Sequence, residues 1–240
     1  MRLKPTALLF ACIAVAGCSS SKQGYTPAPP KTVPPATVAA GSEATLFPFV
    51  EGNTWRFDMD MQQLTQVGAV PQRAEYTMHC KKVETLPGGG TRATLELSKG
   101  DVLQDRQIWK VDSTGIYQEQ AGLETPQKSE PPMPSVIFPL EVDKVVPWAG
   151  KNPSAKGPIP MTAEIVNRGP DTVDTVVGTF SAYRIETTQK YKNEKGDEVV
   201  TTSVTWYAPK VGIVKHRQEV KVGVTLFQTQ ALVLKQYTVK

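Results

Sequence analysis

The chain has 240 residues, a formal net charge of +4 and 21% charged residues. It contains no cluster of five or more lysines or arginines, so its charge gives no case for binding nucleic acid or an anionic membrane patch. Of its three cysteines, Cys12 and Cys18 lie in the N-terminal segment and only Cys80 lies in the body of the chain. No disulfide is therefore expected, and the remaining chain is long enough to be held by its own core.

The first seventeen residues have the layout of a secretory signal peptide. Arg2 and Lys4 provide a positive start, the run 7–16 is apolar, and Ala16-Gly17 places small residues before Cys18. The apolar run is too short to span a bilayer, which takes roughly 20 residues. We therefore expect residues 1–17 to be removed, which lowers the net charge to about +2 because Arg2 and Lys4 leave with them. An ordinary secretory signal with an incidental cysteine is the alternative.

The four residues that end at Cys18 resemble the lipobox of bacterial lipoproteins, here Val15-Ala16-Gly17-Cys18. The resemblance implies a diacylglycerol thioether on Cys18, cleavage before it, and acylation of the new amine, with palmitate as the expected fatty acid. Several acyl chains, at about 0.8 kcal/mol per buried CH₂, would hold the protein firmly on a membrane. By the same resemblance Ser19, unlike an aspartate, favours the outer membrane, and we expect the protein to face the periplasm there.

Residues 18–45 are predicted to form the acylated cysteine and a disordered tether. This stretch is rich in serine and proline and has almost no large apolar side chains, so it cannot bury enough surface to offset the entropy of ordering. A linker that supplies reach is the expected role, and a proline-rich ligand for a partner is the alternative.

From residue 46 to residue 240 the pattern predicts one antiparallel β domain. Apolar residues alternate with polar ones, as in the segment Trp55-Arg56-Phe57-Asp58-Met59, and no amphipathic helical window is longer than about ten residues. Turn signals rich in glycine, asparagine and aspartate separate the segments. The predicted strands lie at 55–60, 74–85, 91–98, 106–111, 114–119, 161–168, 172–177, 179–188, 198–207, 212–221 and 223–239.

The stretch 126–160 interrupts this pattern with nine prolines. Because proline cannot donate a hydrogen bond to a strand ladder, we expect a loop-rich crossover with short strands at 135–140 and 144–150. The predicted fold class is all-β: a single large, curved antiparallel sheet or open half-barrel shared by the halves 46–125 and 161–240. Two separate domains are the alternative.

One segment and a pair of later segments resemble a family of bacterial envelope proteins. The segments 47–57 (FPFVEGNTWRF), 178–186 (GTFSAYRIE) and 205–216 (TWYAPKVGIVKH) are similar to the recurring pattern of the DUF3108-like β proteins, which have no known function. Lys210 stands where that pattern has glycine. The resemblance implies an antiparallel curved sheet and no catalytic residues. From the residues themselves, we expect Trp55, Phe180, Tyr183, Trp206 and Ile213 to pack in the core, with an aromatic ligand platform as the alternative.

The sequence contains no recognisable catalytic, cofactor or metal site. His79 and His216 are the only histidines, and His79 and Cys80 are neighbours on a strand, so they should point to opposite faces. Cys80 has no base nearby in sequence to activate it as a nucleophile. Dispersed carboxylates such as Asp58, Asp60 and Glu164 leave a hydrolase as a third hypothesis.

The sequence thus favours a lipid-anchored, non-catalytic β domain that binds a partner protein or envelope component. The alternative is a LolA/LolB-like carrier that holds a lipid or acyl chain in a concave cavity. A dry cavity of several hundred cubic ångströms would favour the carrier, and a filled core the binding domain. The expected ligand or partner region is the proline-rich stretch, through Met133, Ile137, Phe138 and Trp148, which either plugs the sheet or lines its mouth.

Overall fold

The computed structural model describes residues 34–39, 41–65, 68–123, 127–152 and 158–240, and within these ranges the chain is built almost entirely from β-strands. A short 3-10 helix, η1 (Glu43–Leu46), precedes them. The described part contains no helix long and apolar enough to cross a bilayer. The all-β prediction is confirmed. The strands are β1 (Thr54–Thr65), β2 (Gly68–Thr85), β3 (Thr91–Lys99), β4 (Val102–Asp112), β5 (Gly115–Ala121), β6 (Gln127–Ile137), β7 (Val145–Asn152), β8 (Ile159–Thr175), β9 (Gly178–Lys192), β10 (Glu198–Ala208), β11 (Gly212–Val222) and β12 (Thr225–Thr238).

The strands form one closed antiparallel barrel, in the order β1-β12-β11-β10-β9-β8-β7-β6-β5-β4-β3-β2. Closure comes from β1, which pairs with β2 on one side and with β12 on the other. The prediction of an open half-barrel was therefore wrong, and so was the alternative of two domains. Alternation shows which residues lie on strands, but it does not show that the first strand pairs with the last.

The proline-rich stretch 126–160 is part of the barrel wall and not the loop-rich crossover that was predicted. Strand β6 lies upstream of the short strand expected at 135–140, whereas β7 largely matches the one expected at 144–150. The effect of proline is still visible, because β6 and β7 meet at the single residue pair Glu130↔Lys151. By contrast, β7 pairs with β8 along its whole length. The two strands predicted at 161–168 and 172–177 are one strand, β8.

The ordered domain begins ahead of residue 46. Ala36 and Leu46 are buried, and the backbone N–H of Val38 donates a hydrogen bond to the Tyr183 hydroxyl at 3.3 Å. The prediction of a disordered tether is wrong for the described residues 34–39 and 41–45, because their small apolar side chains pack on the barrel. Residues 18–33 of that tether lie outside the described residues.

A cluster of aromatic rings forms part of the core. Phe47 contacts Trp55 and Trp109, with ring centroids 5.4 Å and 5.5 Å apart. Trp55 is fully buried, and its indole N–H donates to the Val211 carbonyl at 2.6 Å. The residues predicted for the core all belong to it or pack against it.

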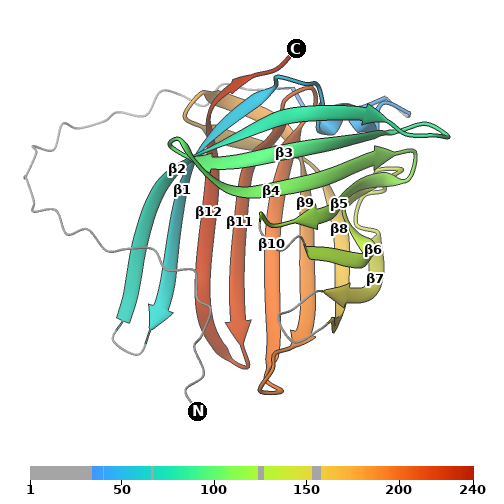
Figure 1. Ribbon diagram of the computed structural model, residues 1–240. Helices are drawn as coiled ribbons and strands as arrows, with labels where there is room; N and C mark the ends of the chain where they lie inside the picture. The colour runs from blue at the N-terminus through green and yellow to red at the C-terminus, as the bar shows by residue number, and fades with distance from the viewer. Residues whose placement is uncertain (1–33, 40, 66–67, 124–126, 153–157) are drawn as a thin grey trace, which may run out of the picture. The chain divides into compact units, whose positions relative to one another are not determined.

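Figure 1 shows that the strands differ in length and direction. Strands β1, β12, β11, β10 and β9 run side by side as long strands, whereas β3 and β4 cross in front of their upper parts in this view. Strand β2 joins the two groups, since its first half pairs with β1 and its second half with β3. The long strands therefore continue beyond the level at which β3 and β4 cross them.

Candidate functional site

The most distinctive surface of the domain is the core-facing side of the long strands, beyond the core itself. Strand β11 shows the pattern: Val214 is fully buried, Gln218 further along the same face is half-buried, and Arg217 and Glu219 on the opposite face are exposed. Strand β12 repeats it with Leu234 and Gln230. We call this surface the inner wall and define it by ten residues: Met61, Gln63, Gln72, Thr187, Gln189, Thr201, Ser203, Gln218, Gln228 and Gln230.

The strand register places these residues in two rows across the sheet. The first row runs from β9 to β2 through Thr187, Ser203, Gln218, Gln230, Met61 and Gln72. The second row contains Gln189 and Thr201 on β9 and β10, then Val220, and then Gln228 and Gln63 on β12 and β1. Six glutamine side chains from five strands thus share one face.

The inner wall carries no formal charge. From the core to the strand ends, the core-facing described positions of β8 to β12, β1 and β2 hold no lysine, arginine, aspartate or glutamate. The charged residues of these strands point outward and pair there, for example Arg73 with Asp60 at 2.7 Å and Lys235 with Glu75 at 2.7 Å. The wall is therefore a neutral surface of amides and hydroxyls, and most of these side chains are partly open to solvent.

The amides of the wall are weakly engaged by the protein. Gln230 Nε2 contacts the Met59 sulfur at 3.6 Å, and Gln189 Nε2 contacts the Met133 sulfur at 3.4 Å. A thioether is a weak hydrogen-bond acceptor. Gln63, Gln72 and Gln228 make no side-chain hydrogen bond to any described residue. The wall therefore presents several donors and acceptors that a ligand could use.

His216 lies at the border between the core and the wall. Its Nδ1 is 2.8 Å from the Thr205 hydroxyl, and its Nε2 is 3.5 Å from the Gln218 side-chain oxygen. Burial lowers the pKa of His216 below its ordinary value, although the hydrogen bond to Gln218 acts in the opposite direction. The imidazole is therefore neutral at pH 7, and the surface stays uncharged here as well.

The residues considered for catalysis or metal binding are not brought together. Cys80 is buried, and burial raises the pKa of its thiol to about 11, with the negative charge of Glu51 acting in the same direction. His79 lies on the opposite face of β2, as predicted. The described residues contain no group of three or more His, Cys, Asp or Glu side chains that could hold a metal ion.

The three carboxylates of the hydrolase hypothesis are separated by the sheet. Asp58 and Asp60 lie on the outward face of β1, where Lys235 and Arg73 pair with them. Glu164 is exposed on the outward face of β8, and four strands lie between β1 and β8 in the barrel order. A shared acid–base site needs both groups near one substrate bond, and this arrangement does not provide one.

The predicted region at Met133, Ile137, Phe138 and Trp148 is divided between three places. Met133 lies beside Gln189 of the inner wall. Ile137 and Phe138 line a small cavity, while Trp148 is buried and lies against Gly150 on the same strand.

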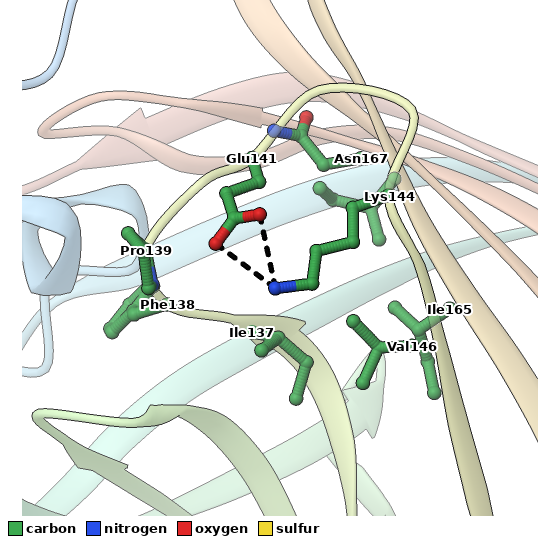
Figure 2. A pocket seen from close by; sticks show the side chains of 9 residues that line it. Ile137, Phe138, Pro139, Glu141, Lys144, Val146, Ile165 and Asn167 are labelled. Atoms are coloured by element: carbon green, nitrogen blue, oxygen red, sulfur yellow. Dashed lines mark hydrogen bonds and ion pairs between the residues drawn. The ribbon is translucent and has the colours of Figure 1, made fainter.

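The cavity has a volume of about 40 Å³. Figure 2 shows the ion pair of Glu141 and Lys144, 3.0 Å apart, beside the apolar side chains and Asn167. Asn167 is buried, and its Nδ2 has no hydrogen-bond partner in the described part of the protein. This volume suits water molecules, which could satisfy that amide, and is far below the roughly 300 Å³ of a small-molecule site.

Sequence comparison assigns part of the chain to a known group of proteins. The model of the family described as DUF3108-like matches residues 90–226, which is more than half of the chain. No protein of curated function is significantly similar to the chain in sequence.

Three solved structures are similar to the fold. A predicted lipoprotein from Parabacteroides distasonis shares 15% identity with a TM-score of 0.51, and the match covers 80% of this chain and 98% of that one. A predicted exported protein with a YmcC-like fold from Bacteroides fragilis shares 14% identity over 80% and 98% of the two chains, with a TM-score of 0.42. The hypothetical lipoprotein YmcC from Escherichia coli shares 9% identity over 82% and 89%, with a TM-score of 0.41. The first of these supports the barrel fold.

Proposed function

The chain belongs to the DUF3108-like family, and from that premise we propose that it is an envelope lipoprotein, anchored through Cys18, whose β domain binds an envelope component or partner protein without catalysing a reaction. The binding surface is the inner wall. The observation that carries the proposal is the neutral, partly exposed set of glutamines whose hydrogen-bonding groups have weak partners or none among the described residues.

The entropy lost on ordering these side chains favours a ligand-binding role for the wall over a purely structural one. A core needs apolar side chains, and on β1, β11 and β12 the fully buried ones, Trp55, Val214 and Leu234, lie towards the aromatic cluster and not along the wall. Glutamine has a long side chain that loses conformational freedom when it is ordered, so six of them on one inward face contribute little to folding. Hydrogen bonds from these amides to a polar ligand can offset that loss of conformational entropy.

The same wall argues against the alternative, a LolA/LolB-like carrier of acyl chains. Covering an amide with hydrocarbon and no compensating hydrogen bond costs roughly 1–3 kcal/mol per group. The cavity beside Ile137 and Phe138 is also too small to hold a chain.

The anchor is tested by labelling cells with an alkyne analogue of palmitate. We expect the full-length protein to carry the label and to fractionate with the outer membrane, whereas a Cys18→Ala variant carries none. An unlabelled wild-type protein would contradict the anchor and would leave the binding surface as a separate question.

The binding surface is tested by photo-crosslinking in cells. A photoreactive amino acid replaces Gln230 on the inner wall of the full-length protein, and in a matched control it replaces Thr229, which points outward from the same strand. We expect a reproducible adduct from position 230 and none from position 229. An adduct from position 229 alone, or from neither, would contradict binding at the wall.

A further inference from the structure

The chemistry of the inner wall restricts the ligands that it can take. A charged ligand would find no counter-charge on this face, because Arg217, Glu219 and the other charged groups of these strands point outward. An acyl chain would leave the wall's amides without partners. What remains is a neutral molecule that is rich in hydrogen-bonding groups.

An extended peptide is also a poor match. Peptides that add to a sheet use the free backbone groups of an edge strand. The strands that carry the wall, from β9 through β12 and β1 to β2, are each paired on both sides. The wall can therefore contact a ligand only through side chains.

The spacing of the wall fits a chain of repeating hydroxyl-bearing units. Gln218, Gln230 and Gln72 belong to one row, with Met61 between the last two, and neighbouring strands lie about 4.8 Å apart. A glutamine amide offers a donor and an acceptor side by side, which matches two neighbouring hydroxyls of a sugar ring. Met61 and Leu232 add apolar surface for the C–H face of a ring.

The amides can change partners at low cost. Gln230 Nε2 and Gln189 Nε2 now face the sulfurs of Met59 and Met133, and a hydroxyl oxygen is a stronger acceptor than a thioether. Tyr191, half-buried on β9 two residues beyond Gln189 on the same face, can stack on a sugar ring at the end of the wall.

We propose that the inner wall is a binding site for a neutral oligosaccharide, which lies across the strands and is held by Gln218, Gln230 and Gln72. This inference rests on the proposed function, because it names the class of envelope component that the wall binds.

The test uses the full-length protein in mild detergent on an array of neutral and acidic oligosaccharides that includes cellohexaose, maltohexaose and chitohexaose. Hits are then titrated by calorimetry. We expect binding to neutral members only. The double variant Gln218→Leu/Gln230→Leu should weaken it at least tenfold, whereas Gln62→Leu, on the outward face of β1, should leave it unchanged.

A second variant covers the case in which the double variant does not fold. Gln230→Glu has nearly the same shape, but at pH 7 it replaces an amide donor with a charge. We expect this variant to bind at least tenfold more weakly at pH 7 and to recover part of its affinity near pH 4, where a glutamate with an ordinary pKa of about 4.3 is largely protonated.

Two results would overturn the inference: binding to no neutral member of the array, or a preference for acidic members. Either result leaves the proposed function standing if the photoreactive group at position 230 still captures a component in cells. If that adduct is lost as well, both the oligosaccharide inference and the proposed binding function are contradicted.

Discussion

The two ends of the long strands use one face of one sheet for different purposes. Near the aromatic cluster the core-facing positions hold Trp55, Val214 and Leu234, all fully buried. Further along the same strands and on the same face, the positions hold Met61, Gln218 and Gln230, all half-buried. The change comes at His216, whose imidazole contacts Thr205 and Gln218. Facing inward and belonging to the core are therefore separate properties in a barrel.

The largest expected effect separates the two ends by stability. Trp55→Ala removes a fully buried indole that contacts Phe47 and donates to Val211, so we expect the free energy of unfolding to fall by about 3–5 kcal/mol. Gln230→Ala, on the same side of the barrel, should change it by less than about 1 kcal/mol. Chemical denaturation of both variants measures this. Similar losses in the two would show that the wall is a structural part of the fold.

The second effect concerns the close packing at Gly150, beside the contact between β6 and β7. A methyl group at Gly150 would lie 2.4 Å from the Trp148 ring and 2.7 Å from the Glu130 carbonyl oxygen, across the single-pair contact between β6 and β7. We expect Gly150→Ala to destabilise the protein by about 1–3 kcal/mol, as overpacking does.

Ala149→Ser is the matched control for this change, because residue 149 is exposed and precedes Gly150 on β7. It should leave the denaturation midpoint unchanged. A Gly150→Ala protein as stable as wild type would mean that β6 and β7 separate freely there.

The strands and the core residues could be predicted from the sequence, but the inner wall was not. Alternation around Trp55 and the glycine-rich turns gave the strands and the core residues, because burial on one face leaves a period of two. Alternation also holds at Gln218 between Arg217 and Glu219, and at Gln228 and Gln230. This amide pattern is the signal that could have revealed the wall.

Three features were missed for physical reasons. Whether a glutamine faces solvent or a barrel interior depends on closure, and closure depends on β1 meeting β12 from the far end of the chain. The burial of Ala36 depends on the surface that it meets, which its own composition does not encode. Prolines 131, 132 and 134 weaken the pairing of β6 with β7, but they do not prevent β6 from pairing with β5.

A third prediction uses the pH dependence of stability at the border between the two ends. Burial lowers the pKa of His216 in the folded protein, so the unfolded chain, with an ordinary pKa of about 6.5, binds a proton more readily. The free energy of unfolding should therefore fall as the pH drops below about 6.5, and level off below the folded pKa.

His216→Gln removes this contribution, so the stability advantage of wild type over the variant should shrink between pH 7.5 and pH 5. Denaturant titrations of both proteins at several pH values measure it. If the advantage of wild type grows as the pH falls, the folded protein stabilises the protonated ring. That result would contradict a neutral His216 at the border between core and wall.

The smallest expected effect lies in the turn between β10 and β11, beside the aromatic cluster. Lys210 has φ of 64°, in the left-handed region where side chains other than glycine are disfavoured by about 1–2 kcal/mol. The Lys210 side chain is exposed, while its backbone N–H donates to Thr45 at 2.8 Å and so holds η1 against the turn. Lys210→Gly keeps that hydrogen bond and relieves the strain, but it adds freedom to the unfolded chain, so we expect a net gain of about 0.5–1 kcal/mol. Lys210→Ala is the control and should gain nothing, because alanine keeps the Cβ that causes the strain. The denaturation midpoints of the two variants test whether backbone strain at Lys210 lowers stability. Equal midpoints would mean that the turn relaxes to another conformation, so that the hydrogen bond to η1 does not require the strained backbone.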